Sequence, residues 1–214
     1  MKFGGSAKPV SGKPVAQGPG VSYTRHSSGF DQFCGMLQSL ENLSILDMSG
    51  ASQANITFIT GFGHRISSDD IVGTMEQCFG EGDFLETQQH ASNAQRFLDQ
   101  CLTFPDAQFD GILVWDTLQF LTGNVLEQTV AQLLRVMRPG GLIFALFHAD
   151  EKVTKIPLYN YRVQDQKTLL LVPRGGYQRV HYFNNRALER MFEKASSLKF
   201  FLTRDNLREV IVRR

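Results

Sequence analysis

The feature that most constrains the fold is a series of short apolar segments separated from one another by helical patterns. Three of these segments, residues 43–48, 111–115 and 142–147, are almost wholly apolar, and acids stand at the ends of the first two, Asp47 and Asp116. Apolar runs of this length are typical of strands that are buried on both faces of a parallel sheet. With helices between them, they predict right-handed βαβ units and a doubly wound α/β fold.

Weaker signals fill in the rest of the pattern. The apolar positions of residues 30–40 and 126–137 recur at helical spacing, so each segment is expected to form an amphipathic helix. Residues 64–70 are interpreted as a second strand that ends in acids. Residues 72–100 favour helices, and residues 83–86 are only a faint candidate for a third strand.

The end of the chain follows a different pattern. Residues 199–203 and 209–213 have the character of strands, and the residues between them are too few for a parallel crossover, so the two should pair antiparallel. Residues 151–182 are expected to form an inserted hairpin or lid that turns at residues 173–176. The predicted fold class is therefore α/β, with a mostly parallel sheet of the seven-stranded type and a C-terminal antiparallel hairpin.

Composition divides the chain into a tail and one domain. Residues 1–26 are rich in Gly, Pro, Ser and Lys and are expected to be a flexible tail, with a basic arm for an anionic partner as the alternative. Residues 27–214 are expected to form the α/β domain. The hydrophobic content of the whole chain is 42%, which is enough for a sizeable core.

Charge and cysteine usage narrow the class of protein. The formal net charge is +1, which does not call for nucleic acid or a membrane surface as a partner. Cys34, Cys78 and Cys101 lack the spacing of metal ligands and are interpreted as reduced core thiols, so no metal site is expected. The chain contains no membrane-length apolar run, and a cytoplasmic location is expected.

Four local matches make the chain resemble the class I S-adenosylmethionine-dependent methyltransferases over about residues 28–214. Residues 45–50, Ile-Leu-Asp-Met-Ser-Gly, look like the strand and loop that begin the cofactor site of that family. Ser68-Asp69-Asp70 stands where the family places an acid for the ribose hydroxyls. Residues 104–118 are similar to the fourth-strand motif, and residues 134–142, with Pro139-Gly140-Gly141, are similar to the turn into the fifth strand.

The resemblance implies a set of cofactor-binding residues. The family has alternating glycines in the loop after the first strand, and this chain has Ser49, Ala51 and Gln53 there, with Gly50 between them. The small residues Ser49 and Ala51 would let a ligand approach the backbone, whereas Gln53 departs from the family's pattern. The alternative to a cofactor-binding loop is a plain strand-to-helix turn that binds no ligand. The cofactor-binding residues implied are Asp47, Ser49, Gly50, Ala51, Asp69, Asp70, Trp115 and Asp116.

Several of these residues also have structural interpretations. Asp69 is the first choice for the ribose, and a solvated turn acid is the alternative. Asp47 either orients the loop or meets the cofactor's ammonium group, and Trp115 either contacts a ligand or packs in the core. His148 could act as a base or be polar filling, so the catalytic residues stay unassigned.

The function implied is methyl transfer from S-adenosylmethionine to a small-molecule acceptor that the sequence does not identify. The alternative is a methyltransferase-like binding or interaction protein without catalysis, which the departure at Gln53 favours. Nicotinamide-dependent oxidoreduction fits poorly because the Gly-x-Gly-x-x-Gly motif is absent after the first strand. The oligomeric state is left open.

Overall fold

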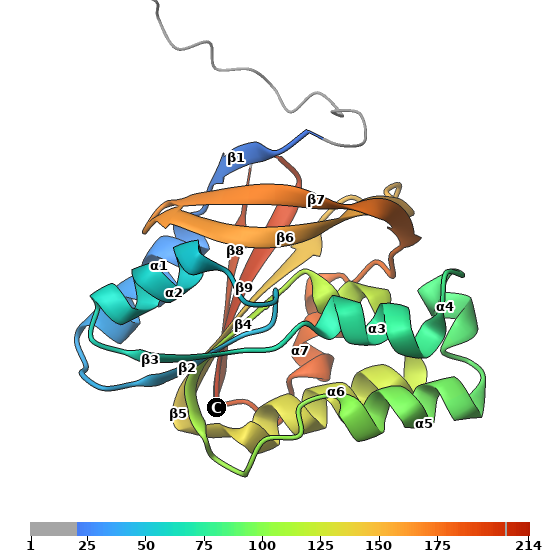
Figure 1. Ribbon diagram of the computed structural model, residues 1–214, viewed down its shortest axis with the longest axis horizontal. Helices are drawn as coiled ribbons and strands as arrows, with labels where there is room; N and C mark the ends of the chain where they lie inside the picture. The colour runs from blue at the N-terminus through green and yellow to red at the C-terminus, as the bar shows by residue number, and fades with distance from the viewer. Residues whose placement is uncertain (1–20, 204) are drawn as a thin grey trace, which may run out of the picture.

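The computed structural model describes residues 21–203 and 205–214. Its main sheet has six strands in the order β3-β2-β4-β5-β9-β8 (Figure 1). The strands, in chain order, are β2 (Ser44–Asp47), β3 (Arg65–Ser68), β4 (Phe109–Trp115), β5 (Met137–His148), β8 (Ser197–Leu202) and β9 (Leu207–Arg213). The first four are parallel to one another, and β9 pairs antiparallel with both β5 and β8. The predicted closing hairpin is therefore confirmed as part of the main sheet.

Helices cover both faces of this sheet. Together with one 3₁₀ turn, η1, they are α1 (Ser28–Gln38), α2 (Gln53–Gly61), α3 (Ile71–Phe79), α4 (Phe84–Thr87), α5 (Ala91–Gln100), η1 (Thr117–Phe120), α6 (Gly123–Val136) and α7 (Asn185–Met191). Side chains of the central strands alternate between two apolar clusters, so that Ile112 packs on the face with α3, α5 and α6, and Leu113 packs on the face with α1. This alternation explains why the central strands are mostly apolar.

A second, smaller sheet lies across the carboxyl ends of the parallel strands (Figure 1). It is formed by β1 (Tyr23–His26), β6 (Lys155–Asp165) and β7 (Thr168–Arg179), in the order β1-β7-β6 with both pairings antiparallel. The pair β6–β7, called the hairpin below, falls inside the insertion expected at residues 151–182. Its turn was predicted wrongly at residues 173–176, since β6 and β7 are joined at residues 166–167.

Two other predictions are corrected. Among the described residues the main sheet has six strands rather than seven, because the faint third-strand candidate at residues 83–86 starts a helical turn, α4. The Asp83 carboxylate caps this turn by accepting a hydrogen bond from Leu85 N. The tail expected at residues 1–26 ends earlier, because residues 23–26 form β1 on the edge of β7. Residues 1–20 lie outside the described part of the chain.

Strand β1 is fixed by a buried ion pair. The side chain of Arg25 is 3% exposed, and its guanidinium lies 2.9 Å from the Glu209 carboxylate and 3.0 Å from that of Asp205. Glu209 is wholly buried on β9 and also accepts a hydrogen bond from Gly29 N at the start of α1. The ion pair therefore ties the small sheet to the main sheet.

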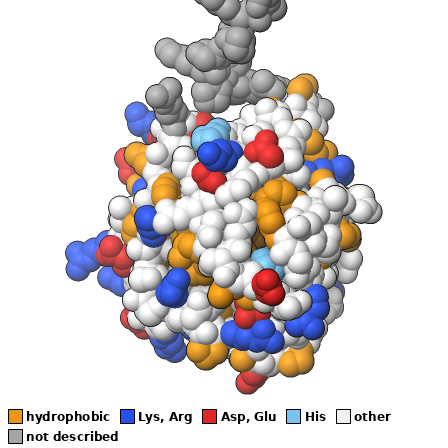
Figure 2. Space-filling view, turned by 90° about the vertical axis from the view of Figure 1, so that its left-hand side faces the viewer, with side chains coloured by type: hydrophobic (Ala, Val, Ile, Leu, Met, Phe, Trp, Pro, Cys, Tyr) orange, Lys and Arg blue, Asp and Glu red, His pale blue; other side chains and the backbone are white. Residues whose placement is uncertain are grey.

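The surface carries little contiguous apolar area where it is described. The exposed large hydrophobic side chains are those of Val21, Leu40, Tyr177 and Leu202, which stand on separate segments. The face shown in Figure 2 has small, separate hydrophobic areas with charged side chains scattered between them. None of the described helices is both long and apolar enough to cross a membrane.

Candidate functional site

A cavity of about 540 Å³ opens between the loop after β2 and the hairpin. The loop side of the cavity is lined by residues 49–52 and Asp70, and the hairpin side by residues 160–162 together with Pro173 and Arg174. A volume of this size is within the usual range for small-molecule sites. The cavity also lies at the carboxyl edge of the parallel strands, where open α/β sheets bind ligands.

The loop that lines the cavity is shaped by a glycine and a helix cap. Gly50 has a φ of +79°, which favours glycine, and its N–H donates to the Asp69 carbonyl at 2.8 Å. Ser52 caps α2 by accepting a hydrogen bond from Asn55 N. Gln53 is exposed on α2, where its amide donates to Thr57 Oγ1, and it does not line the cavity. The departure at Gln53 therefore leaves the cavity open.

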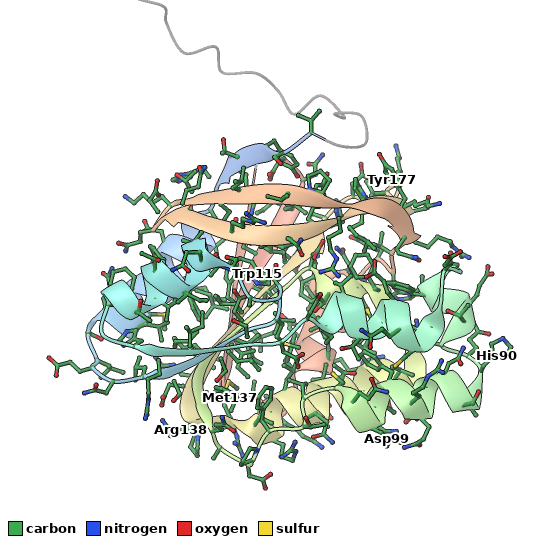
Figure 3. The ribbon with its side chains drawn as sticks, viewed as in Figure 1. His90, Asp99, Trp115, Met137, Arg138 and Tyr177 are labelled. Atoms are coloured by element: carbon green, nitrogen blue, oxygen red, sulfur yellow. The ribbon has the colours of Figure 1, made fainter. Side chains whose placement is uncertain are left out.

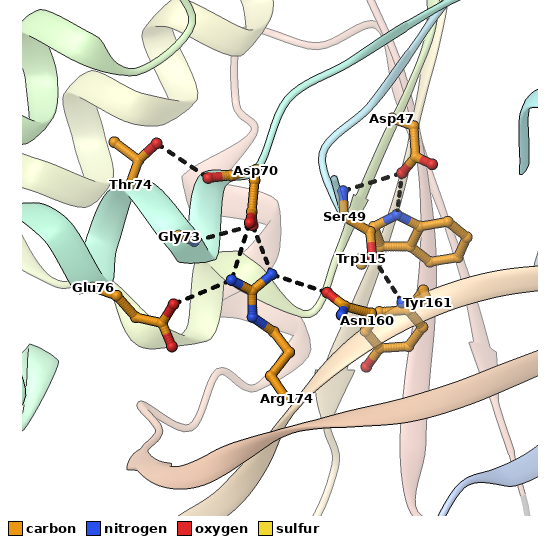
Figure 4. A network of polar contacts seen from close by, with 10 residues as sticks. All are labelled: Asp47, Ser49, Asp70, Gly73, Thr74, Glu76, Trp115, Asn160, Tyr161 and Arg174. Carbon is orange, nitrogen blue, oxygen red and sulfur yellow. Dashed lines mark hydrogen bonds and ion pairs between the residues drawn. The ribbon is translucent and has the colours of Figure 1, made fainter. Parts of the chain in front are cut away.

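Asp47 holds the loop after β2 in place through hydrogen bonds. Its side chain is wholly buried and accepts hydrogen bonds from Ser49 N at 3.1 Å and from the Trp115 indole N–H at 2.7 Å (Figure 4). It also accepts a hydrogen bond from the Asn55 amide. Burial raises the pKa of Asp47, and these three donors offset part of that rise. Because the carboxylate is enclosed by protein donors, its geometry matches the role of orienting the loop rather than that of meeting a ligand's ammonium group.

Trp115 lies beneath the hairpin in the middle of the molecule (Figure 3). Its φ of +59° is unusual for a bulky residue and turns the chain at the end of β4. The indole ring stacks on the Tyr161 ring of β6, with centroids 4.9 Å apart and an interplanar angle of 5°. Trp115 is thus buried between the sheet and the hairpin, and its ring does not line the cavity.

Asp116, next along the chain, is almost completely buried. Burial raises its pKa to about 7, and a hydrogen bond from Tyr161 limits the rise. His148, at the end of β5, has its pKa lowered to about 4, chiefly by burial, so its imidazole is neutral near pH 7. Neither Asp116 nor His148 lines the cavity.

The two neighbouring acids after β3 differ in their surroundings. Asp70 lines the cavity, caps α3 by accepting from Gly73 N at 3.0 Å, and pairs with Arg174. Asp69 does not line the cavity, and burial raises its pKa. Its backbone bridges the loop, because its N–H donates to the Asp47 carbonyl and its carbonyl accepts from Gly50.

Three residues that hold the site together were not predicted from the sequence. Tyr161 N donates to Ser49 Oγ at 2.7 Å, and Asn55 bridges Asp47 to β6 by donating to the Tyr161 carbonyl and accepting from Val163 N. Arg174 pairs with Asp70 (Figure 4). The contacts of Tyr161 and Arg174 cross more than 100 residues of sequence, and no local pattern signals them.

The described residues 21–203 and 205–214 contain no cluster of three His, Cys, Asp or Glu side chains that could hold a metal ion. The three cysteines are free and buried. Burial raises the pKa of Cys34 and Cys101 far above the ordinary range, so these thiols stay protonated at neutral pH.

Comparison with known proteins supports the fold expected from the sequence. A family model described as "Methyltransferase domain" matches residues 63–145, which begin after the loop. The PH0226 protein of Pyrococcus horikoshii has a similar structure with a TM-score of 0.51 and 14% identity, covering 87% of this chain and 89% of that one. The fold is that of a class I S-adenosylmethionine-dependent methyltransferase.

Two further structures with this methyltransferase fold are similar at lower scores. The 1,6-didemethyltoxoflavin-N1-methyltransferase of Burkholderia thailandensis, solved with its substrate and S-adenosylhomocysteine, has a TM-score of 0.49 and 14% identity over 87% of this chain and 78% of that one. An S-adenosylmethionine-dependent methyltransferase of Clostridium acetobutylicum has a TM-score of 0.49 and 10% identity over 86% and 90%. No curated protein matches the chain significantly. The family match supports S-adenosylmethionine as the cofactor expected from the sequence.

Proposed function

We propose that the protein transfers a methyl group from S-adenosylmethionine to a small-molecule acceptor and that the cofactor binds in the cavity between the loop and the hairpin. The observation that carries the proposal is the cavity itself, because it combines a glycine-containing loop, a helix N-terminus and an acid at the carboxyl edge of a methyltransferase-type sheet. When bound, S-adenosylmethionine supplies an electrophilic methyl group on its sulfonium.

The lining residues fit such a ligand in part. Ser49, Gly50 and Ala51 are small enough for a ligand to approach the backbone, and the amides at the start of α2 suit a carboxylate. The Asp70 carboxylate can accept two hydrogen bonds from a ribose diol, so we assign it this role in place of the first choice, Asp69. Asp47 and Trp115 do not reach the cavity and are proposed to position the loop.

The hairpin supplies the opposite wall. Asn160, Arg162 and Pro173 line the cavity from this side and are proposed to select the acceptor. By covering the carboxyl edge, the hairpin also limits the access of water to the reacting groups. Alignment of the two reactants and exclusion of water can supply much of the acceleration in an in-line displacement at a sulfonium.

The proposal is tested by filling the cavity. Ala51 lines the cavity and is exposed, so Ala51→Leu should weaken the binding of S-adenosylmethionine by at least about tenfold, measured by calorimetric titration, because the added atoms collide with the ligand. Ala54→Leu adds the same atoms at an exposed position of α2 outside the cavity and should leave the affinity unchanged. Equal affinities for the two variants would mean that the cofactor binds elsewhere.

A methyltransferase-like interaction protein without catalysis is the second candidate. The pairing of Asp47 and Asp70 with other protein groups is the observation that favours it, whereas the comparisons give it no support. If S-adenosylmethionine and S-adenosylhomocysteine both fail to bind at millimolar concentration, the methyl-transfer proposal is excluded and this alternative is retained.

A further inference from the structure

Arg174 forms an ion pair with Asp70, the acid that the proposed function assigns to the ribose. Its guanidinium donates to both oxygens of Asp70, at 2.8 Å and 3.0 Å, in the two-pronged geometry that makes arginine–carboxylate pairs strong. The same side chain donates to Asn160 Oδ1 at 2.9 Å and to Glu76 Oε2 at 3.1 Å (Figure 4). Arg174 thus contacts two carboxylates, one inside the cavity lining and one on α3 outside it.

A bulge in β7 brings Arg174 to this place. Pro157 pairs with Tyr177 and Tyr159 pairs with Pro173, so that residues 174–176 of β7 stand opposite a single residue of β6. Gly175 and Gly176 have φ values of +89° and +77°, which turn the strand locally. On either side of the bulge, β7 pairs with β6 in regular register. At the bulge, the Arg174 side chain is directed to α3, and it is 14% exposed there.

The pairing leaves Asp70 with too few acceptor sites for a diol, because a carboxylate accepts about four hydrogen bonds and this one already accepts three. Asp70 Oδ1 accepts from Gly73 N and from Arg174, and Asp70 Oδ2 accepts from Arg174. A ligand that donates two hydroxyl groups to this carboxylate must therefore displace the guanidinium. Glu76 is already 3.1 Å from Arg174 and 44% exposed, so it can keep the displaced charge paired.

We infer that Arg174 is a positioning residue that releases Asp70 and keeps its ion pair with Glu76 when the cofactor's ribose diol binds. The inference rests on the proposed function. Arg174 and the ligand compete for one carboxylate, and Glu76 sets how easily Arg174 gives it up. The affinity for the cofactor is therefore governed by a side chain that lies on the hairpin rather than on the sheet.

Three variants test whether Arg174 releases Asp70 when the ligand binds, with S-adenosylhomocysteine as the titrated ligand. Arg174→Met frees Asp70 and should tighten binding by about tenfold. Glu76→Gln removes the charge of the alternative partner and should weaken binding several-fold. Arg179→Met is the matched control, because Arg179 lies on the same strand and pairs with Asp83 and Glu86 away from the cavity, and it should leave binding unchanged.

The fluorescence of Trp115, the single tryptophan, shows whether the hairpin stays in place. Its emission should be the same in the protein and in all three variants, since the Tyr161 stack and the Asn55 contacts are untouched. Weaker or unchanged binding by Arg174→Met, or a red shift of its Trp115 emission, would mean that Arg174 only holds the hairpin and would overturn the inference. Absence of binding in the protein and in every variant would instead remove the proposed function.

Discussion

The indole of Trp115 and the phenol of Tyr161 lie almost parallel at 4.9 Å, one at the end of β4 and the other in the middle of β6. The same Trp115 donates its N–H to Asp47, and the Tyr161 backbone donates to Ser49. One aromatic pair therefore joins the hairpin, the central strand and the proposed cofactor loop. Its position beside the cavity makes the hairpin part of the site as well as its cover.

The stack makes Tyr161 a determinant of stability. Tyr161 is 3% exposed, and Tyr161→Ala should lower the free energy of unfolding by about 3 to 5 kcal/mol, because a large aromatic side chain is removed from a packed region. Urea unfolding followed by Trp115 fluorescence measures the change. Tyr177→Ala, at a site 37% exposed on the same hairpin, should cost about 0.5 kcal/mol or less. Similar losses in the two variants would mean that the stack adds nothing.

Asp116 should make stability depend on pH. Its folded pKa of about 7 lies above its ordinary value of 3.8, so the folded state holds its proton more tightly than the unfolded state. The resulting stabilisation is present below about pH 4 and is lost as the pH rises through about 7, at about 1.4 kcal/mol for each unit of pKa difference. Asp116→Asn cannot ionise there and should therefore lose less stability between pH 5 and pH 8 than the unaltered protein does, as measured by denaturant unfolding. Parallel curves for the two proteins would contradict the assignment.

Arg25 should be needed for the stability of the whole domain. Arg25→Met leaves Glu209 buried without its counter-charge, which typically costs about 3 to 5 kcal/mol. The double variant with Glu209→Gln, which keeps an acceptor for Gly29 N, should recover part of the loss in thermal unfolding. A truncation of residues 1–26 removes Arg25 and should likewise lower the melting temperature, which reverses the expectation from composition. A melting temperature unchanged by all three alterations would mean that the ion pair is not stabilising.

The parallel strands and the closing hairpin could be predicted from the sequence because their signals are local. Residues 43–48 are mostly apolar and residues 142–147 are apolar throughout, and the short connection between β8 and β9 excludes a parallel crossover. Where the pattern was faint, the local chemistry decided otherwise. Residues 83–86 are only a faint candidate for a strand by their sequence, since an acid followed by Phe84-Leu85 caps a helical turn equally well, and α4 forms there.

Long-range contacts explain what could not be predicted. By composition, the four residues of β1 belong to a polar tail. They are ordered by the ion pair between Arg25 and Glu209, which lies 184 positions later in the sequence. Asp69 and Asp70 are indistinguishable as neighbouring acids, and only the placement of Arg174 and the cavity separates them. The loop residues that line the cavity were therefore among those predicted from the sequence, whereas the hairpin residues that line its other side were not.

The place of β9 has a consequence for how the protein is made. This strand lies between β5 and β8 in the sheet, yet it follows both of them in the chain. While a ribosome is still adding residues 149–206, the long apolar strand β5 has an unpaired edge, and Glu209 has not yet been made to neutralise Arg25. Such an edge readily pairs with other chains. The chain is therefore more exposed to aggregation before β9 is made than after it has paired, and chaperones that shield nascent chains should raise its yield.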